Sequence, residues 1–152
     1  MTSDVTRGTL ARAVLEGLAF EARTSLEPLL AFAGLDTIPS ITAIGGGAKN
    51  DLLLRIKASV INTPIRVLDV EEGTALGAAM LGGLAAAVYR DVDDAVASIR
   101  SQSHVVEPMQ DTVAVYDAYY RDVYRDLYNT LRPLNHRIHA LAVGETEAES
   151  PG

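Results

Sequence analysis

The first fifth of the chain carries apolar residues at helical spacing. They are Leu10, Val14, Gly17, Leu18, Leu26 and Leu30. This pattern predicts a long helix from about Thr9 to Ala33, with a cap at Thr6 or Thr9. Gly34 is suited to end that helix, and Pro28 is expected to kink it.

Two short β-prone runs alternate with two further helices in the middle of the chain. In order, these elements are a strand from Ile41 to Ile44, a helix from Asn50 or Asp51 to about Ile61, a strand from Ile65 to Val70 and a helix from Thr74 to Tyr89. This order predicts an α/β fold with two parallel strands flanked by helices. The Ala/Gly-rich last helix is expected to lie buried against the sheet. Its apolar stretch is shorter than the roughly 20 residues that span a bilayer, so no membrane partner is expected.

A helical extension is predicted to follow. Asp91 caps a short helix over Val92 to Arg100, and a final helix runs from about Thr112 to Leu131. Its tyrosines recur at four-residue spacing, which favours core packing; they are Tyr116, Tyr120, Tyr124 and Tyr128. Pro133 is expected to end or kink this helix. Residues 144–152 are predicted to be a disordered tail, which leaves residues 1–143 as the folded portion.

The predicted sheet is too small to be stable alone, because it has only two parallel strands. Both runs are apolar enough to be covered by helices on both faces, and both outer edges would be unpaired. Further strands therefore come from another polypeptide, or the chain is a piece of a larger domain, which we favour. Unpaired edges also predict self-association or marginal stability.

Composition excludes several classes of function. The 152 residues carry a formal net charge of -7, and no basic cluster falls on a predicted helix face, so a nucleic-acid partner is not expected. The absence of cysteine excludes disulfides, thiol nucleophiles and thiolate metal sites. Residues Met1 to Leu10 lack the basic-then-apolar order of a signal peptide, which favours a cytoplasmic protein.

The strongest chemical signal is a glycine-rich run between a strand and a helix. It reads Ile44-Gly45-Gly46-Gly47-Ala48-Lys49-Asn50. Glycines allow the backbone to approach a ligand closely, and the N-terminus of the following helix presents unpaired N–H groups to an anion. This pattern fits a nucleotide or another anion, but three glycines can also make a tight turn that binds nothing. The local pattern leaves both interpretations open.

Of two standard phosphate-binding motifs, one is absent from this run and the other is partly present. The P-loop pattern that ends in Gly-Lys-Ser/Thr is absent. The dinucleotide-binding fingerprint is half met, since Gly45 and Gly47 have its first spacing and Asp69 is placed as the ribose-binding acid. Asn50 occupies the third glycine position, where close packing of helix on strand disfavours a large side chain. A dinucleotide-binding domain of an oxidoreductase is therefore the second candidate.

Three blocks of sequence, with the Tyr-rich last helix, resemble one known family. The blocks are Arg12-Ala13-Val14-Leu15-Glu16-Gly17-Leu18-Ala19-Phe20-Glu21, then Ile44 to Asp51, then Val70-Glu71-Glu72-Gly73-Thr74-Ala75-Leu76-Gly77-Ala78-Ala79. In this order they are similar to the C-terminal part of the FGGY carbohydrate kinases, over about residues 7–131. Within the family, their sequence most resembles that of the xylulokinases. The family has two actin-like (ribonuclease-H-like) domains with ATP between them. The resemblance implies that this chain is part of the second, nucleotide-binding domain.

The resemblance also implies that the glycine turn binds ATP or ADP. The residues that would form this site are Gly45, Gly46, Gly47, Ala48 and Asn50. Backbone at Gly46 and Gly47 would approach the adenosine or phosphates, and Asn50 would offer a side-chain hydrogen bond as well as a helix cap. Lys49 lines the same turn, but its side chain is expected to be solvated.

Several parts of the family have no counterpart in this sequence. They are the sugar-binding N-terminal domain, the opening strands of the second domain, the catalytic aspartate and the loops that hold phosphates and Mg²⁺. Phosphoryl transfer depends on such groups, so neither a catalytic residue nor a metal ligand is expected here, and the chain alone is expected to be inactive. Met1 to Asp4 corresponds to mid-domain in the family, which predicts a truncated or split gene product or an excised fragment.

In the intact enzyme, the expected reaction is transfer of the ATP γ-phosphate to a sugar hydroxyl, with xylulose as the expected sugar. The sugar would reach this chain only through the missing N-terminal domain. A third candidate is a non-catalytic interaction module that pairs with a separate N-terminal half, and a homo-oligomer is another expected assembly.

The remaining titratable residues are better explained by structure than by chemistry. Glu71 and Glu72 precede a helix, where acidic residues are ordinarily stabilising, so catalysis is not expected of them. His104, His136 and His139 are too scattered for a catalytic triad. The last two have no acidic residue nearby, so a metal site is not expected there.

Overall fold

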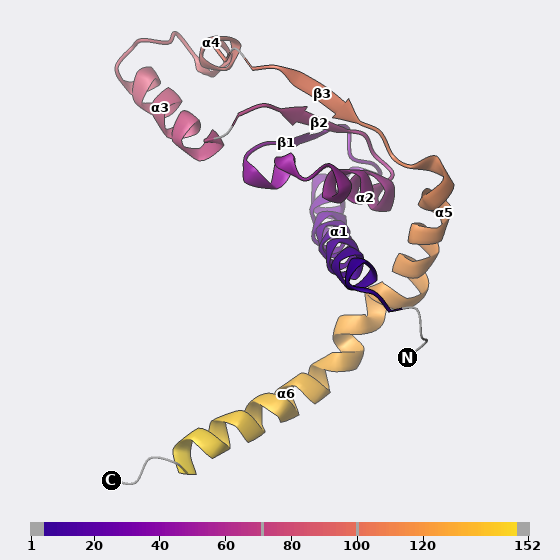
Figure 1. Cartoon of the computed structure of the whole chain (residues 1–152). Coiled ribbons are helices and arrows are strands. Elements are labelled where there is room, and N and C mark those ends of the chain that lie inside the picture. The colour runs from indigo at the N-terminus through magenta and orange to yellow at the C-terminus, as the bar shows by residue number, and fades with distance from the viewer. Residues whose placement is uncertain (1–4, 71, 100, 149–152) are drawn as a thin grey trace. The chain divides into compact units, whose positions relative to one another are not determined.

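Helices and short strands alternate along residues 7–106, and the chain is helical from Gln110 to Ala148 (Figure 1). The computed structural model describes residues 5–70, 72–99 and 101–148. The chain divides into two compact units, residues 1–113 and residues 114–152. All the strands of the described residues lie in the first unit.

The long helix α1 extends from Arg7 to Ala33. Thr6 caps its start: the Thr9 backbone N donates to Thr6 Oγ1 at 3.1 Å, and the Thr6 backbone N donates to Thr9 Oγ1 at 2.7 Å. Gly34 ends the helix in the left-handed region, with a φ of 66°. The predicted helix, its cap and its terminating glycine are confirmed, and the helix continues through Pro28.

The sheet has three short strands among the described residues, in the spatial order β1-β2-β3. β1 (Ile41–Ala43) pairs parallel with β2 (Ile65–Leu68), as predicted. β3 (Ser103–Val106) pairs antiparallel with the other edge of β2. The sheet is therefore mixed, and the prediction of two parallel strands is corrected to three strands.

β3 was not predicted because its own sequence is a weak strand former. Its first two residues, Ser103 and His104, are polar, and the strand is only 4 residues long. Strand formation depends mainly on cross-strand neighbours, which a local pattern does not reveal. Here those neighbours belong to β2: Val106 lies opposite Ile65, and a hydrogen bond of 3.0 Å from Asp69 N to Gln102 O extends the pairing.

Helix α2 (Asp51–Ile61) covers one face of the sheet (Figure 1). The core on this face joins two helical and three strand residues: Leu54, Ala58, Ile65, Val67 and Val106. α1 packs against α2, and Arg23 Nη1 donates a hydrogen bond of 3.0 Å to Val60 O. Removal of these apolar side chains from water is the main stabilising contribution within the first unit.

The opposite face of the sheet is exposed. The strand register places Thr42, Arg66 and Val105 side by side on this face. Thr42 and Arg66 are exposed, and Val105 is 53% exposed. Such alternation is typical of a sheet that is covered on one face. The described residues therefore cover the sheet on one face, and not on both faces as predicted.

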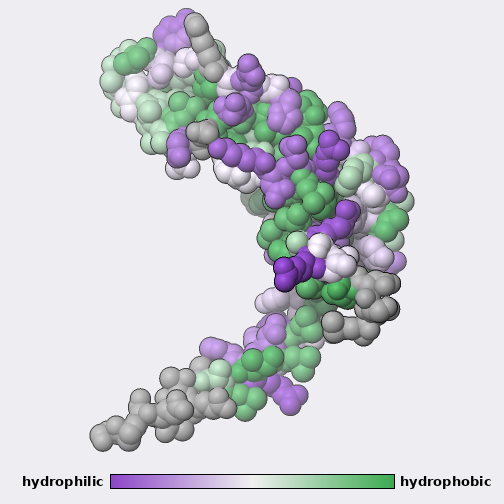
Figure 2. Space-filling model, viewed as in Figure 1, coloured by the Kyte–Doolittle hydropathy of each residue, from purple (hydrophilic) through white to green (hydrophobic). Residues whose placement is uncertain are grey.

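Helix α3 (Gly73–Ala85) is apolar, yet it has no buried residue. Leu81 is 69% exposed, and Figure 2 shows hydrophobic side chains on the surface around this helix. The prediction that α3 lies buried against the sheet is wrong for the described residues, where its neighbour is the short helix α4 (Val92–Ala97). One side of α3 is half-buried, at Leu76, Met80 and Leu84, and the rest of this apolar helix is exposed, which leaves room for a further neighbour. No helix of the described residues is long and apolar enough to cross a membrane.

The last part of the chain is helical but not uniform. In order it contains α5 (Gln110–Tyr119), a π-helical turn (Tyr120–Tyr124) and α6 (Arg125–Ala148). Tyr116 and Tyr120 are buried, whereas Tyr128 is 70% exposed. Tyr128 lies beyond the π-helical turn, in α6. The predicted tyrosine core is therefore confirmed only at its start.

α6 continues through Pro133, so the predicted end of the helix near Leu131 is wrong. Residues 144–148 form its last turn, and residues 149–152 lie outside the described residues. The disordered tail over 144–152, and the domain boundary at residue 143, stay predictions. Residues 1–4, which the fragment hypothesis invoked, also lie outside the described residues.

Candidate functional site

The glycine turn, residues 45–50, connects β1 to α2 and is fastened to the end of β2. The Gly45 N donates to Val70 O at 3.1 Å, and the Ala48 N donates to Gly45 O at 3.0 Å. Gly45 has φ 78° and ψ -167°, a backbone region that is essentially restricted to glycine. Gly46–Lys49 then form one short 3-10 turn. Gly45 is thus required for the shape of the turn.

Gly46 and Gly47, in contrast, are not required by the described fold. Neither has a positive φ, and a Cβ added at either position would meet nothing within 4 Å. Glycine is less favourable than alanine inside a regular element by roughly 0.5–1 kcal/mol. These two glycines therefore leave open space in front of the backbone, which allows close approach by a ligand or by another chain.

Asn50 lies at the start of α2. Its Oδ1 accepts a hydrogen bond of 3.0 Å from the Leu53 backbone N, so the residue is the N-cap predicted from the sequence. The Asn50 Nδ2 donor has no partner among the described residues. The Asn50 Oδ1 atom thus caps α2, and the Nδ2 atom is available to donate a hydrogen bond to a ligand at the turn.

The start of α3 lies against the same turn. A Cβ added at Gly73 would come within 2.6 Å of Ile44 Cδ1, so only glycine fits there without displacing the Ile44 side chain. Ile44 directly precedes Gly45 and is itself 50% exposed. The turns that follow β1 and β2 are therefore joined twice, once by the Gly45–Val70 hydrogen bond and once by this contact.

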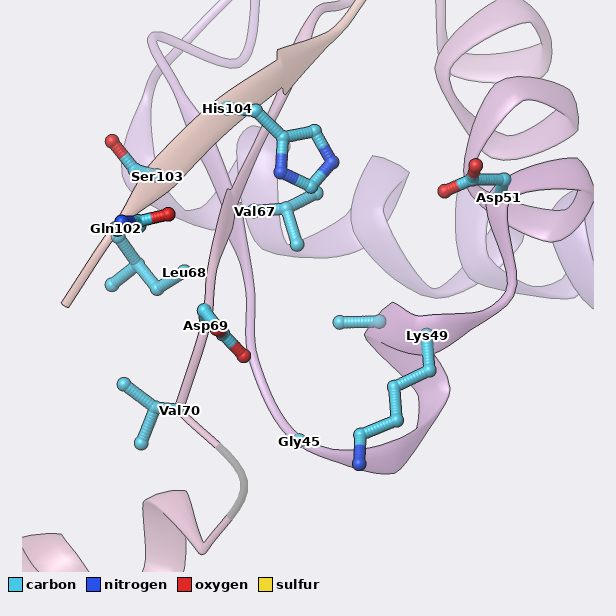
Figure 3. A pocket seen from close by; sticks show the side chains of 11 residues that line it. Gly45, Lys49, Asp51, Val67, Leu68, Asp69, Val70, Gln102, Ser103 and His104 are labelled. Atoms are coloured by element: carbon cyan, nitrogen blue, oxygen red, sulfur yellow. The ribbon is translucent and has the colours of Figure 1, made fainter.

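A pocket of about 430 Å³ lies beside the glycine turn, on the face of the sheet that α2 covers (Figure 3). Gly45 and Ala48 line this pocket, whereas Gly46, Gly47 and Asn50 do not. The structure therefore places two of the five predicted site residues at this pocket. The other three belong to the turn but not to the pocket wall.

Asp51 and His104, which the sequence assigned to no ligand site, also line this pocket, together with Lys49 and with Asp69, the ribose-binding acid of the dinucleotide-binding alternative. Figure 3 shows the Asp51 carboxylate and the His104 ring pointing into the same space, from α2 and from β3. A second pocket of about 430 Å³ shares these two residues and adds Arg55 and Glu107. His104 was missed because β3 was not predicted, and no local pattern marks it.

The pocket residues carry charges of both signs and form no metal centre. In the described parts of the chain, no three His, Asp or Glu residues are grouped so that they could hold a metal ion. Glu71, one member of the carboxylate pair, lies outside the described residues. Glu72 is the N-cap residue of α3, and its side chain makes no capping hydrogen bond.

Comparison with known sequences gives one consistent result. Residues 1–86 match the C-terminal domain of the FGGY family of carbohydrate kinases. The xylulose kinase of Bacillus subtilis is 32% identical over 124 residues, which cover 82% of this chain and 24% of that protein. The glycerol kinase of Dechloromonas aromatica is 34% identical over 130 residues, which cover 84% of this chain and 26% of that protein. The chain thus spans about a quarter of the length of these curated relatives.

Solved structures agree with the sequence comparison. The xyloylose kinase of Brucella ovis superposes with a TM-score of 0.73 and 34% identity, covering 88% of this chain and 27% of that chain. The glycerol kinase of Plasmodium falciparum, solved with ADP, gives a TM-score of 0.66 and 28% identity, covering 84% and 26%. The small mixed sheet and its helices are therefore shared with these structures.

Proposed function

Because the chain belongs to the FGGY family of carbohydrate kinases, we propose that it forms one wall of the nucleotide site of an ATP-dependent sugar kinase. The observation that carries this proposal is the pair Gly46 and Gly47, whose glycine identity the described fold does not require. Open space in front of their backbone accommodates an adenosine or a phosphate. The similar glycerol kinase of Plasmodium falciparum was solved with ADP, which agrees with this assignment.

Each residue of the turn has a separate role in the proposed site. Gly45 sets the shape of the turn, and Gly46, Gly47 and Ala48 form the surface that the nucleotide approaches. Asn50 donates from Nδ2 to the nucleotide while its Oδ1 continues to cap α2. The N-terminus of α2 adds a partial positive charge, which favours the phosphates.

The complete reaction is proposed for a larger assembly than this chain. The γ-phosphate of ATP would pass to a sugar hydroxyl, with xylulose as the proposed sugar, in line with xylulose kinases among the relatives. The catalytic base, the sugar site and the Mg²⁺ ligands are assigned to the three quarters of the relatives that this chain does not match. This chain would be part of their actin-like second domain and would bind nucleotide without catalysing transfer.

A thermal-shift titration with Mg·ATP, Mg·ADP and NAD tests the proposal. We expect ATP or ADP to raise the melting temperature, because a ligand that binds only the folded state stabilises it. Gly46→Val and Gly47→Val fill the open space and should abolish this shift while leaving the unliganded melting temperature nearly unchanged. A larger shift with NAD than with ATP would instead support the dinucleotide-binding alternative and contradict the kinase assignment.

Asn50 needs a matched pair of variants, because its side chain both caps α2 and is proposed to bind the nucleotide. Asn50→Asp keeps an oxygen acceptor for the Leu53 N but removes the Nδ2 donor. It should weaken nucleotide binding without the loss of stability caused by Asn50→Ala. Gly82→Ala, at an open position within α3, is the control that should leave the nucleotide shift unchanged. Equal nucleotide shifts in Asn50→Asp and the unaltered chain would remove Asn50 from the site.

A second candidate function is an interaction module that completes a kinase from a separate polypeptide. The apolar helix α3, which has no buried residue, and the uncovered face of the sheet favour it. Mixing this chain with a polypeptide that carries the other three quarters of the Bacillus subtilis xylulose kinase tests the idea. ATP-dependent phosphorylation of xylulose by the mixture, and by neither part alone, is the expected result. No complex between the two parts would count against this function but not against nucleotide binding.

A further inference from the structure

Strand β3 has an outer edge that pairs with no strand of the described residues, because it is the last in the order β1-β2-β3 (Figure 1). Three consecutive residues of this strand are exposed: Ser103, His104 and Val105. Consecutive side chains of a strand point to opposite faces, so exposure of all three means that neither face of β3 is covered there. An uncovered strand edge is a template for pairing with another strand.

The hydrogen-bond pattern determines which backbone groups of β3 point away from β2. The Asp69 N donates to Gln102 O at 3.0 Å, which makes these two opposite residues a hydrogen-bonded pair. Such pairs alternate along an antiparallel ladder, so His104 also bonds to β2. The N–H and C=O groups of Ser103 and Val105 therefore point outward, and no described residue forms a hydrogen bond with them.

The two pockets of the candidate site lie on the α2 side of this edge and meet at His104, which lines both. Their charged residues comprise more carboxylates than cations: Asp51, Asp69 and Glu107 against Lys49 and Arg55. None of the three carboxylates forms an ion pair with a described residue. A strand added beside β3 would point every second side chain to this side, about 7 Å apart, where cationic side chains match the carboxylates.

We propose that the outer edge of β3 binds an extended basic segment of another protein, which adds to the sheet as an antiparallel strand. Backbone hydrogen bonds to Ser103 and Val105 supply the affinity, and basic side chains that reach the carboxylates of Asp51 and Glu107 supply the specificity. Antiparallel pairing is slightly more stable per residue than parallel pairing. The proposal does not require nucleotide binding at the glycine turn.

Charge favours a basic segment over a second copy of this chain at the edge. A two-fold antiparallel pairing of β3 with itself would place His104 opposite the His104 of the other copy. It would also bring the three carboxylates of each copy to the same side of the joined sheet, and each chain carries a formal net charge of -7. Like charges oppose such a pair, whereas the same charges attract a cationic strand.

A short synthetic peptide in which lysine alternates with threonine is the probe, and fluorescence anisotropy measures its binding to the full chain. When the lysines point to the α2 side, antiparallel pairing directs the threonine N–H groups to β3 and the lysine N–H groups to solvent. N-methylation of the threonines should therefore weaken binding by about tenfold or more. N-methylation of the lysines should leave it unchanged. Equal binding of the two N-methylated peptides would overturn strand addition.

Variants at Val105 test whether the peptide binds at this edge. Val105→Pro removes an outward N–H but no hydrogen bond to β2, and proline is tolerated at such edge positions. It should weaken peptide binding by about fivefold or more with a nearly unchanged melting temperature. Val105→Thr keeps the N–H and should bind as the unaltered chain does. Unchanged binding by a folded Val105→Pro variant would overturn the assignment of the edge.

Charge substitutions test the preference for a basic segment. Asp51→Asn with Glu107→Gln should weaken peptide binding about fivefold. Asp36→Asn with Asp93→Asn removes the same charge at exposed positions outside both pockets and should have little effect. Equal losses in the two double variants, or equal binding of a peptide with glutamate in place of lysine, would contradict the proposed specificity. A dimer of the chain that Val105→Pro converts to a monomer would make a second copy the occupant and overturn the proposal.

Discussion

Helices α2 and α3 hold comparable places in the chain, since each follows one strand of the parallel pair. α2 includes Asp51, Arg55 and Lys57, yet 5 of its residues are buried: Leu54, Ile56, Ala58, Ser59 and Val60. α3 contains no charged residue and has no buried one. The more apolar helix is therefore the less buried of the two.

This contrast separates two properties that are usually found together. How much of a helix is buried depends on the neighbours present in this chain. Its apolar composition can also suit neighbours that belong to another part of an assembly. α2 has both its neighbours, the sheet and α1, within this chain. α3 also carries Gly77 and Gly82, where an added Cβ would meet nothing within 4 Å. Such small residues on an apolar helix are suited to close approach by a further element.

Truncating one leucine in each helix should show the largest difference between α2 and α3. Leu54→Ala should lower the free energy of unfolding by about 2–5 kcal/mol, because Leu54 is 3% exposed and its loss leaves a cavity. Leu81→Ala, at a residue 69% exposed, should change it by less than about 0.5 kcal/mol. Urea unfolding followed by circular dichroism measures both. Similar losses in the two variants would mean that α3 is buried in solution.

The glycines of the turn before α2 are expected to differ in the same way. Gly45→Ala should cost about 1–3 kcal/mol of unfolding free energy, because Gly45 lies in a backbone region that other residues rarely adopt. Gly46→Ala should be nearly neutral, since neither its φ nor its surroundings require glycine. Chemical unfolding of both variants tests this. A large loss in Gly46→Ala would show that Gly46 has a structural role.

The start of α2 is capped by a side chain, and the start of α3 is not. Asn50→Ala should therefore destabilise the protein by about 1 kcal/mol through loss of the bond to Leu53 N. Asn50→Asp should be close to neutral because it keeps the acceptor. Glu72→Ala should have little effect, since Glu72 makes no capping bond. Thermal melts without ligand measure all three, and equal effects at residues 50 and 72 would contradict the difference.

Within α3, two adjacent glycines should respond in opposite directions. Gly82→Ala should raise stability by up to about 1 kcal/mol, because alanine is the better helix former and its Cβ meets open space. Gly83→Ala should lower it, since the new Cβ would come within 2.5 Å of Tyr89 Cε2. Unfolding in urea distinguishes them. A gain in both variants would indicate that the Tyr89 ring moves aside freely.

The smallest expected effect is the pH response of the α4 cap region beside α3. The hydrogen bond from the Arg90 side chain, and then that from its backbone N, lowers the pKa of Asp94. A lowered folded-state pKa means that the contribution is present above the unfolded value of about 3.9 and is lost as pH falls through the folded value. Asp94→Asn should therefore be less stable than the unaltered chain near neutral pH, with the difference shrinking in acid. A pH-independent difference in urea midpoints would contradict this cause.

Features encoded within a few residues could be predicted from the sequence. Thr6, Gly34 and Asn50 cap or end helices through hydrogen bonds to residues at most five positions away, and all three were assigned to helix ends. The glycine turn was likewise predicted between a strand and a helix, because a run of glycines is a local turn signal. Whether it binds a nucleotide stays a proposal.

Features that depend on distant residues could not be predicted. β3 exists because β2 supplies its partner, and His104 reaches the pocket only through that pairing. The burial of α3 was predicted from composition, which does not say whether a neighbour is present. The different roles of Gly45 and Gly46 were also hidden, since three consecutive glycines look alike in sequence but only one has a positive φ.

The double link between the two turns has a thermodynamic consequence. The hydrogen bond from Gly45 to Val70 and the contact between Ile44 and Gly73 connect the glycine turn to the start of α3. Anything that covers α3 and shifts its first turn must also shift Ile44 and the backbone beside it. If a nucleotide binds at the glycine turn and a polypeptide binds on α3, we expect the two to be heterotropic effectors of one another. Each would change the affinity for the other by the same factor, so docking measured with and without nucleotide would give one coupling free energy from either direction.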